Sequence, residues 1–171
     1  AMELSIAFVP PMPGYDGIPP GDYIPGYARR NLAESGYPDG KNFPKIEYFY
    51  DAAESHRKIA QVLKDSWSKE LGIQVDLREE NFGDYLPKVH NRDFNGLAII
   101  YWVPDFNDPF AFLQILRYNN EDGYGQLWKN SKFDEKLKEA NREFDQGRRS
   151  ALLTEAESIA LSDLPIIPLQ F

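Results

Sequence analysis

The stretch over residues 101–109 combines the side chains best suited to holding a small ligand. Tyr101, Trp102 and Phe106 offer aromatic surface, and the stretch is stiffened by two prolines. Asp105 adds a negative charge beside these rings. The combination suits a ligand with a positive end and an apolar body. The candidate ligand-binding residues are therefore Asp105, Trp102, Tyr101 and Phe106.

The same residues also allow a purely structural interpretation, and the pattern leaves both open. In it, Trp102 belongs to the core, and either Asp105 or Asp108 caps the helix that follows. Aspartate is favoured at that position because its carboxylate accepts hydrogen bonds from the free N–H groups at a helix start. Asp108 is the better cap of the two, because Pro109 suits the first helical position.

Histidines and cysteines give no sign of a catalytic or metal centre. His56 begins a polar helical turn and His90 follows a short predicted helix, so both are interpreted as solvated surface residues. The chain has no cysteine, which excludes thiolate metal sites and cysteine nucleophiles. It also has no G-x-S-x-G motif and no glycine-rich phosphate loop. We expect no metal and no cofactor.

Two pairs of neighbouring acids are the remaining candidates for catalysis, because two carboxylates are enough for glycoside hydrolysis. The pairs are Glu79-Glu80 and Glu121-Asp122. Most such pairs are solvated loop charges, since acidic side chains are seldom buried without a partner. The sequence favours a protein that is not an enzyme, with a carboxylate-pair hydrolase domain as the alternative of another class.

The charge balance excludes several kinds of partner. With 27 acidic and 19 basic side chains, the chain has a net charge of −8. Nucleic acid or an anionic membrane surface would need clustered Lys and Arg, so neither is expected as a partner. The longest apolar run, Leu97–Val103, is far shorter than the roughly 20 residues that span a bilayer.

The first 25 residues contain six of the 13 prolines. Proline fixes φ and lacks an N–H donor, so this stretch is interpreted as an extended arm over residues 1–25, anchored by Phe8, Tyr15 and Tyr23. Ala1 is interpreted as a remnant of tag cleavage. The absence of an export signal then carries no information about where the protein is found.

Hydrophobic periodicity predicts alternating strands and helices in the middle of the chain. Strands are expected over 46–50, 73–79 and 97–103, and helices over 25–35, 54–71 and 82–89. This β-α-β-α-β order implies right-handed crossovers and a largely parallel sheet. The apolar run of the last strand predicts burial on both faces. Residues 101–109 would then lie at the carboxyl end of the sheet, where ligand crevices form.

The remainder is predicted to be mainly helical. Helices are expected over 131–144 and 148–162. The first of them has an apolar stripe formed by Phe133, Leu137, Ala140 and Phe144. A final edge strand is expected over 166–169, where Pro168 cannot donate to a ladder. Together these elements predict a single α/β lobe over 26–171, with a mixed, mostly parallel sheet flanked by helices.

The stretch Trp102–Pro109, followed by Phe112-Leu113, resembles the W-x-x-D-[YF]-x-[DE]-P…F-L signature of the family 5 solute-binding proteins. These proteins serve ABC importers of oligopeptides, dipeptides and nickel. Three further stretches resemble the family in the same order, namely Ala28–Lys41, Leu71–Val75 and Asp163–Leu169. Four such stretches in order across most of the chain make the resemblance specific.

The resemblance implies one lobe of a two-lobed, type II periplasmic-binding-protein-like fold that captures peptides between its lobes. Asp105 would receive the α-amino group of the peptide, and Trp102 would line the pocket. Arginines that some members place upstream have no equivalent, because Ile99 and Ile100 occupy that stretch. The implied partners are the missing first lobe and an ABC permease. The implied protein is monomeric and periplasmic or on the cell surface, in some members as a lipoprotein.

Two alternatives to peptide capture remain besides the hydrolase. One is the same fold binding another solute, such as an oligosaccharide or a metal chelate. The other is a periplasmic interaction module with no small ligand. The identity and length of the ligand, and the permease, lie beyond what the sequence indicates.

Overall fold

The computed structural model describes residues 7–19, 22–117 and 128–169. Contacts divide the chain into two compact units. Residues 23–101 form the sheet unit, and residues 1–22 together with 102–171 form the helical unit. The assignment of residues 1–25 to an extended arm and of residues 26–171 to a single lobe stays a prediction.

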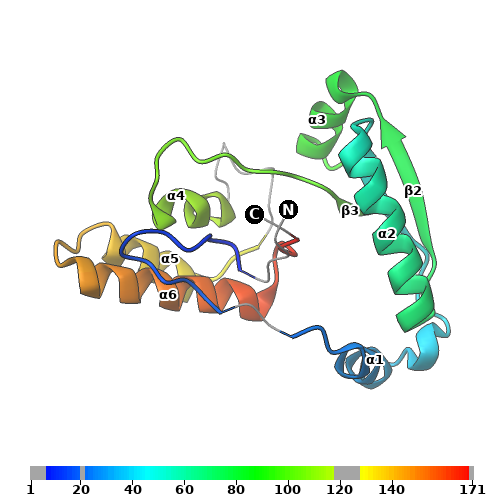
Figure 1. Ribbon diagram of the computed structural model, residues 1–171, viewed down its shortest axis with the longest axis horizontal. Helices are drawn as coiled ribbons and strands as arrows, with labels where there is room; N and C mark the ends of the chain where they lie inside the picture. Colours follow the sequence, from blue (N-terminus) through cyan, green and yellow to red (C-terminus); the bar gives the residue numbers. More distant parts are fainter. Residues whose placement is uncertain (1–6, 20–21, 118–127, 170–171) are drawn as a thin grey trace. The chain divides into compact units, whose positions relative to one another are not determined.

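The sheet unit is built around three parallel strands in the order β2-β1-β3. Its elements are α1 (Pro25–Glu34), a 3-10 turn η1 (Pro38–Gly40), β1 (Ile46–Asp51), α2 (Glu54–Leu71), β2 (Val75–Glu80), α3 (Phe82–His90) and β3 (Gly96–Ala98). The predicted order of elements and the parallel sheet are confirmed. Figure 1 shows α2 running alongside β2.

Alternate residues of the central strand β1 pack against different helices. Tyr48 contacts Trp67 of α2 edge-on, with ring centroids 6.4 Å apart. Phe49 packs instead against Tyr85 of α3, at 4.7 Å. Because neighbouring strand residues point to opposite faces, α2 covers one face of the sheet and α3 the other. All three residues Tyr48, Phe49 and Tyr50 are buried, so β1 is the centre of this unit's core.

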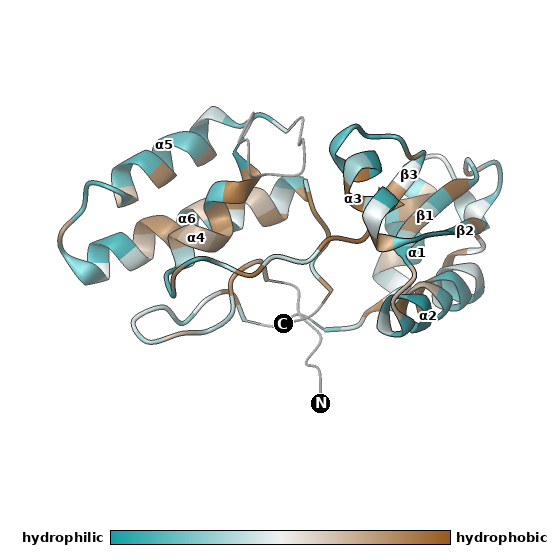
Figure 2. Ribbon diagram, turned by 90° about the horizontal axis from the view of Figure 1, so that it is seen from above, coloured by the Kyte–Doolittle hydropathy of each residue, from teal (hydrophilic) through white to brown (hydrophobic). Residues whose placement is uncertain are grey.

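The helical unit contains α4 (Pro109–Leu113), a 3-10 turn η2 (Gln114–Leu116), α5 (Ser131–Ala140) and α6 (Gln146–Asp163). Helices α5 and α6 lie side by side (Figure 1). Figure 2 shows α5 mostly hydrophilic, with its hydrophobic residues confined to part of its surface. The core that α5 and α6 share with α4 and η2 includes Leu113, Leu116, Phe133, Leu137, Ala140, Leu153, Ala156 and Ala160.

The N-terminal arm is held on α6 by one buried carboxylate, Glu157, which is 0% exposed. Its Oε1 accepts hydrogen bonds from the N–H groups of Phe8 (2.7 Å) and Val9 (2.8 Å), and the Tyr15 hydroxyl donates to Oε2. Burial raises the pKa of Glu157 above its usual value. Of the predicted anchors, Tyr15 is buried and Phe8 packs on the core, whereas Tyr23 is 76% exposed and is not an anchor.

The predicted strand over 97–103 is wrong in its length and burial. Only Gly96–Ala98 form a strand, pairing with β1, and Ile99 N–H adds one further hydrogen bond to Phe49 O. Beyond it the chain has no sheet partner, and Tyr101 and Val103 are 55% and 77% exposed. An apolar run shows that residues can be buried, but pairing also requires a neighbouring strand that continues beside them.

Two predictions near the C-terminus are also wrong. Helix α5 ends at Ala140, not at residue 144, and Phe144 is 98% exposed, because the chain turns there and Asp145 caps α6 through Arg148 N–H. Residues 166–169 form no strand. Ile166 packs on the helical core instead, as a single side chain. The described residues include no helix that is long and apolar enough to cross a membrane.

Candidate functional site

The loop that follows Tyr101 is fixed to the helical unit at its start. The indole N–H of Trp102 donates to the carbonyl oxygen of Ala111 at 3.1 Å, which ties the loop to α4. The Trp102 ring is partly buried and packs against the core. The structural interpretation of Trp102 is therefore confirmed, and its predicted contact with a ligand stays a prediction.

The loop is fixed at its other end by Asp108. Its Oδ1 accepts from Phe110 N–H at 2.8 Å, so Asp108 caps α4 as predicted. Arg149 of α6 adds two hydrogen bonds, both 2.8 Å, one to each carboxylate oxygen. Burial opposes ionisation of Asp108, but the hydrogen bonds from Arg149 and Phe110 hold its pKa below the usual value. No spacing in the sequence identifies Arg149, which is 41 residues away.

Between these two fixed points the loop presents Asp105 to solvent. Asp105 is exposed, and it makes no hydrogen bond or ion pair with any residue in the described part of the chain. Phe106 beside it is 49% exposed. A carboxylate that has no partner in the described part of the chain and a half-exposed aromatic ring thus lie on a loop whose two ends are tied to helices. Trp102, Asp105 and Phe106 belong to the helical unit, and Tyr101 is the last residue of the sheet unit.

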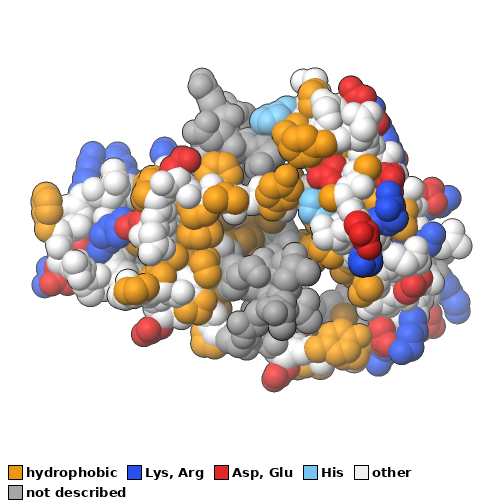
Figure 3. Space-filling model, turned by 45° about the horizontal axis from the view of Figure 1, so that its top comes forward, with side chains coloured by type: hydrophobic (Ala, Val, Ile, Leu, Met, Phe, Trp, Pro, Cys, Tyr) orange, Lys and Arg blue, Asp and Glu red, His pale blue; other side chains and the backbone are white. Residues whose placement is uncertain are grey.

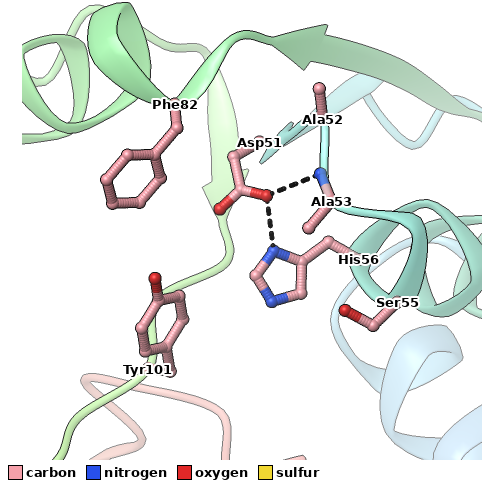
Figure 4. Close-up of a pocket in the computed structure, with 7 residues that line it drawn as sticks. All are labelled: Asp51, Ala52, Ala53, Ser55, His56, Phe82 and Tyr101. Atoms are coloured by element: carbon pink, nitrogen blue, oxygen red, sulfur yellow. Dashed lines mark hydrogen bonds and ion pairs between the residues drawn. The ribbon is translucent and has the colours of Figure 1, made fainter.

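A second candidate site is a cavity of about 660 Å³ in the sheet unit (Figure 4). Its lining residues are Asp51, Ala52, Ala53, Ser55, His56, Phe82 and Tyr101. They follow the carboxyl ends of the three parallel strands, which is where α/β sheets form ligand crevices. Of the four predicted site residues, only Tyr101 lines this cavity.

An aspartate–histidine pair forms one wall of the cavity. Asp51, only 3% exposed, accepts hydrogen bonds at its Oδ1 from Ala53 N–H and from Nδ1 of His56, both at 2.9 Å. The His56 side chain is 15% exposed, so the interpretation of His56 as a solvated residue is wrong. The ring of Tyr101 lies 5.6 Å from the imidazole. The sequence signal is an aspartate that ends a strand three residues before the next helix begins, and the sequence-based interpretation did not include it.

The described carboxylate pair does not have the setting of a hydrolase. Glu79 is bound by Arg57 through two hydrogen bonds of 2.8 Å, and Glu80 is bound by Lys88. The hydrogen bonds from these cations lower the pKa of both carboxyls, whereas a general acid needs a raised one. Figure 3 shows acidic and basic side chains next to one another over this unit. The other pair, Glu121-Asp122, lies outside the described residues.

The comparisons with known proteins decide the family. Residues 3–124 match the model described as bacterial extracellular solute-binding proteins, family 5, middle region. The chain belongs to this family. The family is one of solute-binding proteins and not an enzyme family.

Several curated family 5 proteins are similar over most of the chain. It is 33% identical over 145 residues to the oligopeptide-binding protein OppA of Bacillus subtilis. It is 34% identical over 144 residues to YgiS of Escherichia coli, a probable deoxycholate-binding periplasmic protein. These alignments cover 85% and 84% of this chain but 26% of each relative. The chain thus spans about a quarter of the length of these relatives.

Solved structures of the family share the fold. An oligopeptide-binding protein of Borrelia burgdorferi matches 99% of this chain with a TM-score of 0.93 at 29% identity. The murein tripeptide-binding protein MppA of Escherichia coli matches 99% of it with a TM-score of 0.89 at 26% identity. In both, the match covers 34% of the solved chain. The predicted fold class, part of a type II periplasmic binding protein, is confirmed.

Proposed function

We propose that this chain is one ligand-binding lobe of a solute-binding protein that captures peptides and delivers them to an ABC permease. Family membership supports solute binding, and most of the similar proteins are named for oligopeptides, dipeptides or murein peptides. The rest of the protein would supply the other lobe. Such a protein works outside the cytoplasmic membrane, in the periplasm or at the cell surface.

The observation that carries the proposal is the free carboxylate of Asp105. It is exposed and unpaired among the described residues, on a loop that Trp102 and Asp108 tie to α4 and α6. Because the loop is already fixed, it loses little conformational entropy when a ligand binds to Asp105. Asp105 is thereby preorganised to receive a cation.

Peptides supply the cation that this arrangement requires. When a solute is enclosed, a carboxylate leaves water, and the desolvation cost must be offset by a positive partner with hydrogen bonds to give. The α-ammonium group of a peptide has three N–H donors and is present whatever the side chains are. Phe106 and Trp102 would contact the apolar part of the first residues. Recognition at Asp105 would therefore be independent of peptide sequence.

Calorimetric titration of the full-length protein with a peptide series tests this proposal. We expect Asp105→Ala to weaken peptide binding by roughly 2–5 kcal/mol, the range for truncating one partner of an enclosed charge pair. Asp16→Ala, which removes an exposed aspartate of the arm, is the matched control and should leave the affinity unchanged. Normal peptide binding by the Asp105→Ala variant would remove Asp105 from the site.

A second candidate function is capture of a solute that is not a peptide. It is favoured by YgiS, the relative with 34% identity that is named for deoxycholate, an anion without an ammonium group. An oligosaccharide and a metal chelate are two further examples of a solute that is not a peptide. Binding of deoxycholate by the full-length protein, with no measurable binding of any peptide, would favour this candidate over the first.

A further inference from the structure

The sequence contains one asparagine that is followed directly by glycine, at Asn95-Gly96. Gly96 is the first residue of β3, and both residues of the pair are exposed. The side-chain amide of an asparagine can be attacked by the backbone nitrogen of the next residue, because the attack closes a five-membered ring. Glycine has no side chain to hinder that approach. The fold decides whether the two groups are free to react.

The backbone nitrogen of Gly96 faces the open edge of the sheet. Glu47 N–H donates to Asn95 O at 2.9 Å, and further along β3 the N–H of Ile99 donates to Phe49 O at 3.0 Å. Hydrogen bonds to one neighbour recur at every second residue of a parallel strand, so the N–H of Gly96 points away from β1. In the order β2-β1-β3 no described strand lies on that side.

The side-chain amide of Asn95 is not held by the fold. Asn95 lies in a bend before β3, and its backbone N–H and C=O both bond to Glu47. Its side chain makes no hydrogen bond with a described residue. The side chains of Asn81 and Asn130, in contrast, each cap a helix. The amide carbon of Asn95 can therefore turn towards the nitrogen of Gly96.

Asn91, in the same connection between α3 and β3, is the matched comparison. It is exposed like Asn95. The N–H of the next residue, Arg92, is already bound, because it donates to Val89 O at 3.0 Å. The arginine side chain also hinders approach to that nitrogen. The residue after Asn141 is bound in the same way, so neither of these asparagines meets both conditions.

Strand pairing requires the glycine that makes this step reactive. Gly96 has a φ of 140°, and a Cβ atom at this position would lie 2.3 Å from the carbonyl oxygen of Glu47. Any other residue would therefore push β3 away from β1. The glycine is fixed by the fold, and Asn95 is the position that can be varied.

We propose that Asn95 is a site of spontaneous deamidation, which converts it to aspartate and iso-aspartate. The nitrogen of Gly96 loses its proton to a solvent base and bonds to Cγ of Asn95, and the Cγ–Nδ2 bond breaks and releases ammonia. Water then opens the succinimide ring. Opening at Cγ gives aspartate, and opening at the backbone carbonyl carbon gives iso-aspartate, in which the chain runs through the side-chain carbons.

Iso-aspartate at position 95 would weaken the attachment of β3. Its longer backbone moves the carbonyl oxygen that accepts from Glu47 N–H. The new carboxylate also lies near that of Glu47, which accepts from the N–H of residue 95 at 3.3 Å, and the like charges repel. Strand β3 has only three residues, so the loss of one hydrogen bond removes much of its pairing.

Peptide mapping by tandem mass spectrometry tests the proposal on the folded full-length protein after incubation in mildly alkaline buffer. The fragment that carries residue 95 should gain one mass unit and separate into two products, while the fragment that carries Asn91 stays unchanged. Asn95→Gln should abolish the change, because glutamine would have to close a larger ring. Asn91→Gln is the matched control and should leave the change at residue 95 as it was.

A urea-denatured sample shows what the fold contributes. We expect residue 95 to react in both states. No mass gain at residue 95 in the folded protein, or an equal gain at Asn91, would overturn the proposal, and peptide capture would be unaffected. After the same incubation, the unmodified sequence should unfold at a lower urea concentration than Asn95→Gln. Equal unfolding midpoints, with residue 95 converted, would contradict the effect assigned to β3.

Discussion

Asp51 and Asp105 differ in burial and in hydrogen bonding, and this difference separates an aspartate with a structural role from one that is available to a ligand. Asp51 is 3% exposed and has two hydrogen-bond partners, so it is part of the wall of its cavity. Asp105 is exposed and has no partner among the described residues, so its carboxylate is available to something else. The loop that carries Asp105 is fixed by a third aspartate, Asp108, only three residues away. Residue type alone does not separate these roles, whereas the partners do.

The largest effect is expected at the buried carboxylate that holds the arm. Glu157→Ala would leave two N–H groups and the Tyr15 hydroxyl without an acceptor, inside a core. Each such loss costs about 1–3 kcal/mol, and we expect about 3–5 kcal/mol less stability in urea unfolding. Destabilisation below about 1 kcal/mol would show that the arm is not held by Glu157.

Glu157→Gln separates the hydrogen bonds from the charge. The amide oxygen can still accept from Phe8 and Val9, so the loss should be smaller than with alanine. Because burial raises the pKa of Glu157, the part of its contribution to stability that depends on protonation is complete below the usual carboxyl value of 4.5 and is lost as pH rises through the folded-state pKa. The loss of unfolding free energy in Glu157→Gln, relative to the unmodified chain, should therefore be smaller at pH 8 than at pH 4. The opposite trend would contradict the assigned direction of the shift.

A smaller effect is expected at Asp108. Asp108→Asn keeps a helix cap but loses the charge that Arg149 binds, so we expect about 1–2 kcal/mol of destabilisation at neutral pH. The pKa of Asp108 is lowered in the folded state, so this contribution is complete above the unfolded value of 3.8 and is lost as pH falls through the lower folded-state pKa. Urea unfolding at pH 7 and pH 3 checks the prediction. A difference from the unmodified chain that is as large at pH 3 as at pH 7 would count against the ion pair.

The smallest effect on stability is expected at Asp105. No hydrogen bond or ion pair with a described residue is lost in Asp105→Asn, so its unfolding free energy should stay within about 0.5 kcal/mol of the unmodified value. Thermal and urea unfolding, run beside Asp108→Asn, would sharpen the contrast between two aspartates of one loop. A clear destabilisation at Asp105 would show a structural role and weaken the case for a binding role.

The sequence predicted the bounds of a helix well wherever a residue next to the helix marks its start or its end. The helix over 54–71 has the predicted bounds because its apolar spacing stops at Gly72, whose φ of 69° is the left-handed value that glycine tolerates. Pro109 likewise marked the start of α4 and identified Asp108 as its cap. Such signals reside in neighbouring residues, so the sequence alone shows them.

Contacts between distant residues could not be predicted in the same way. The ion pair of Arg149 with Asp108 spans 41 residues, and the hydrogen bond of Val9 to Glu157 spans 148. The apolar stretch over 97–103 looked like a full strand, although β1 offers it partners only as far as Ile99. These features depend on which elements meet, and periodicity carries no information about that.

The most direct measurement combines the Asp105 variant with a modified ligand in one thermodynamic cycle. Titration calorimetry would compare the full-length protein and Asp105→Asn, each with a peptide that has a free amino terminus and with its N-acetylated form. If Asp105 receives the α-ammonium group, each change alone should weaken binding by roughly 2–5 kcal/mol, and the two together should weaken it little further. Additive losses, or an N-acetylated peptide that binds the unmodified protein as tightly as the free one, would contradict the proposed role of Asp105.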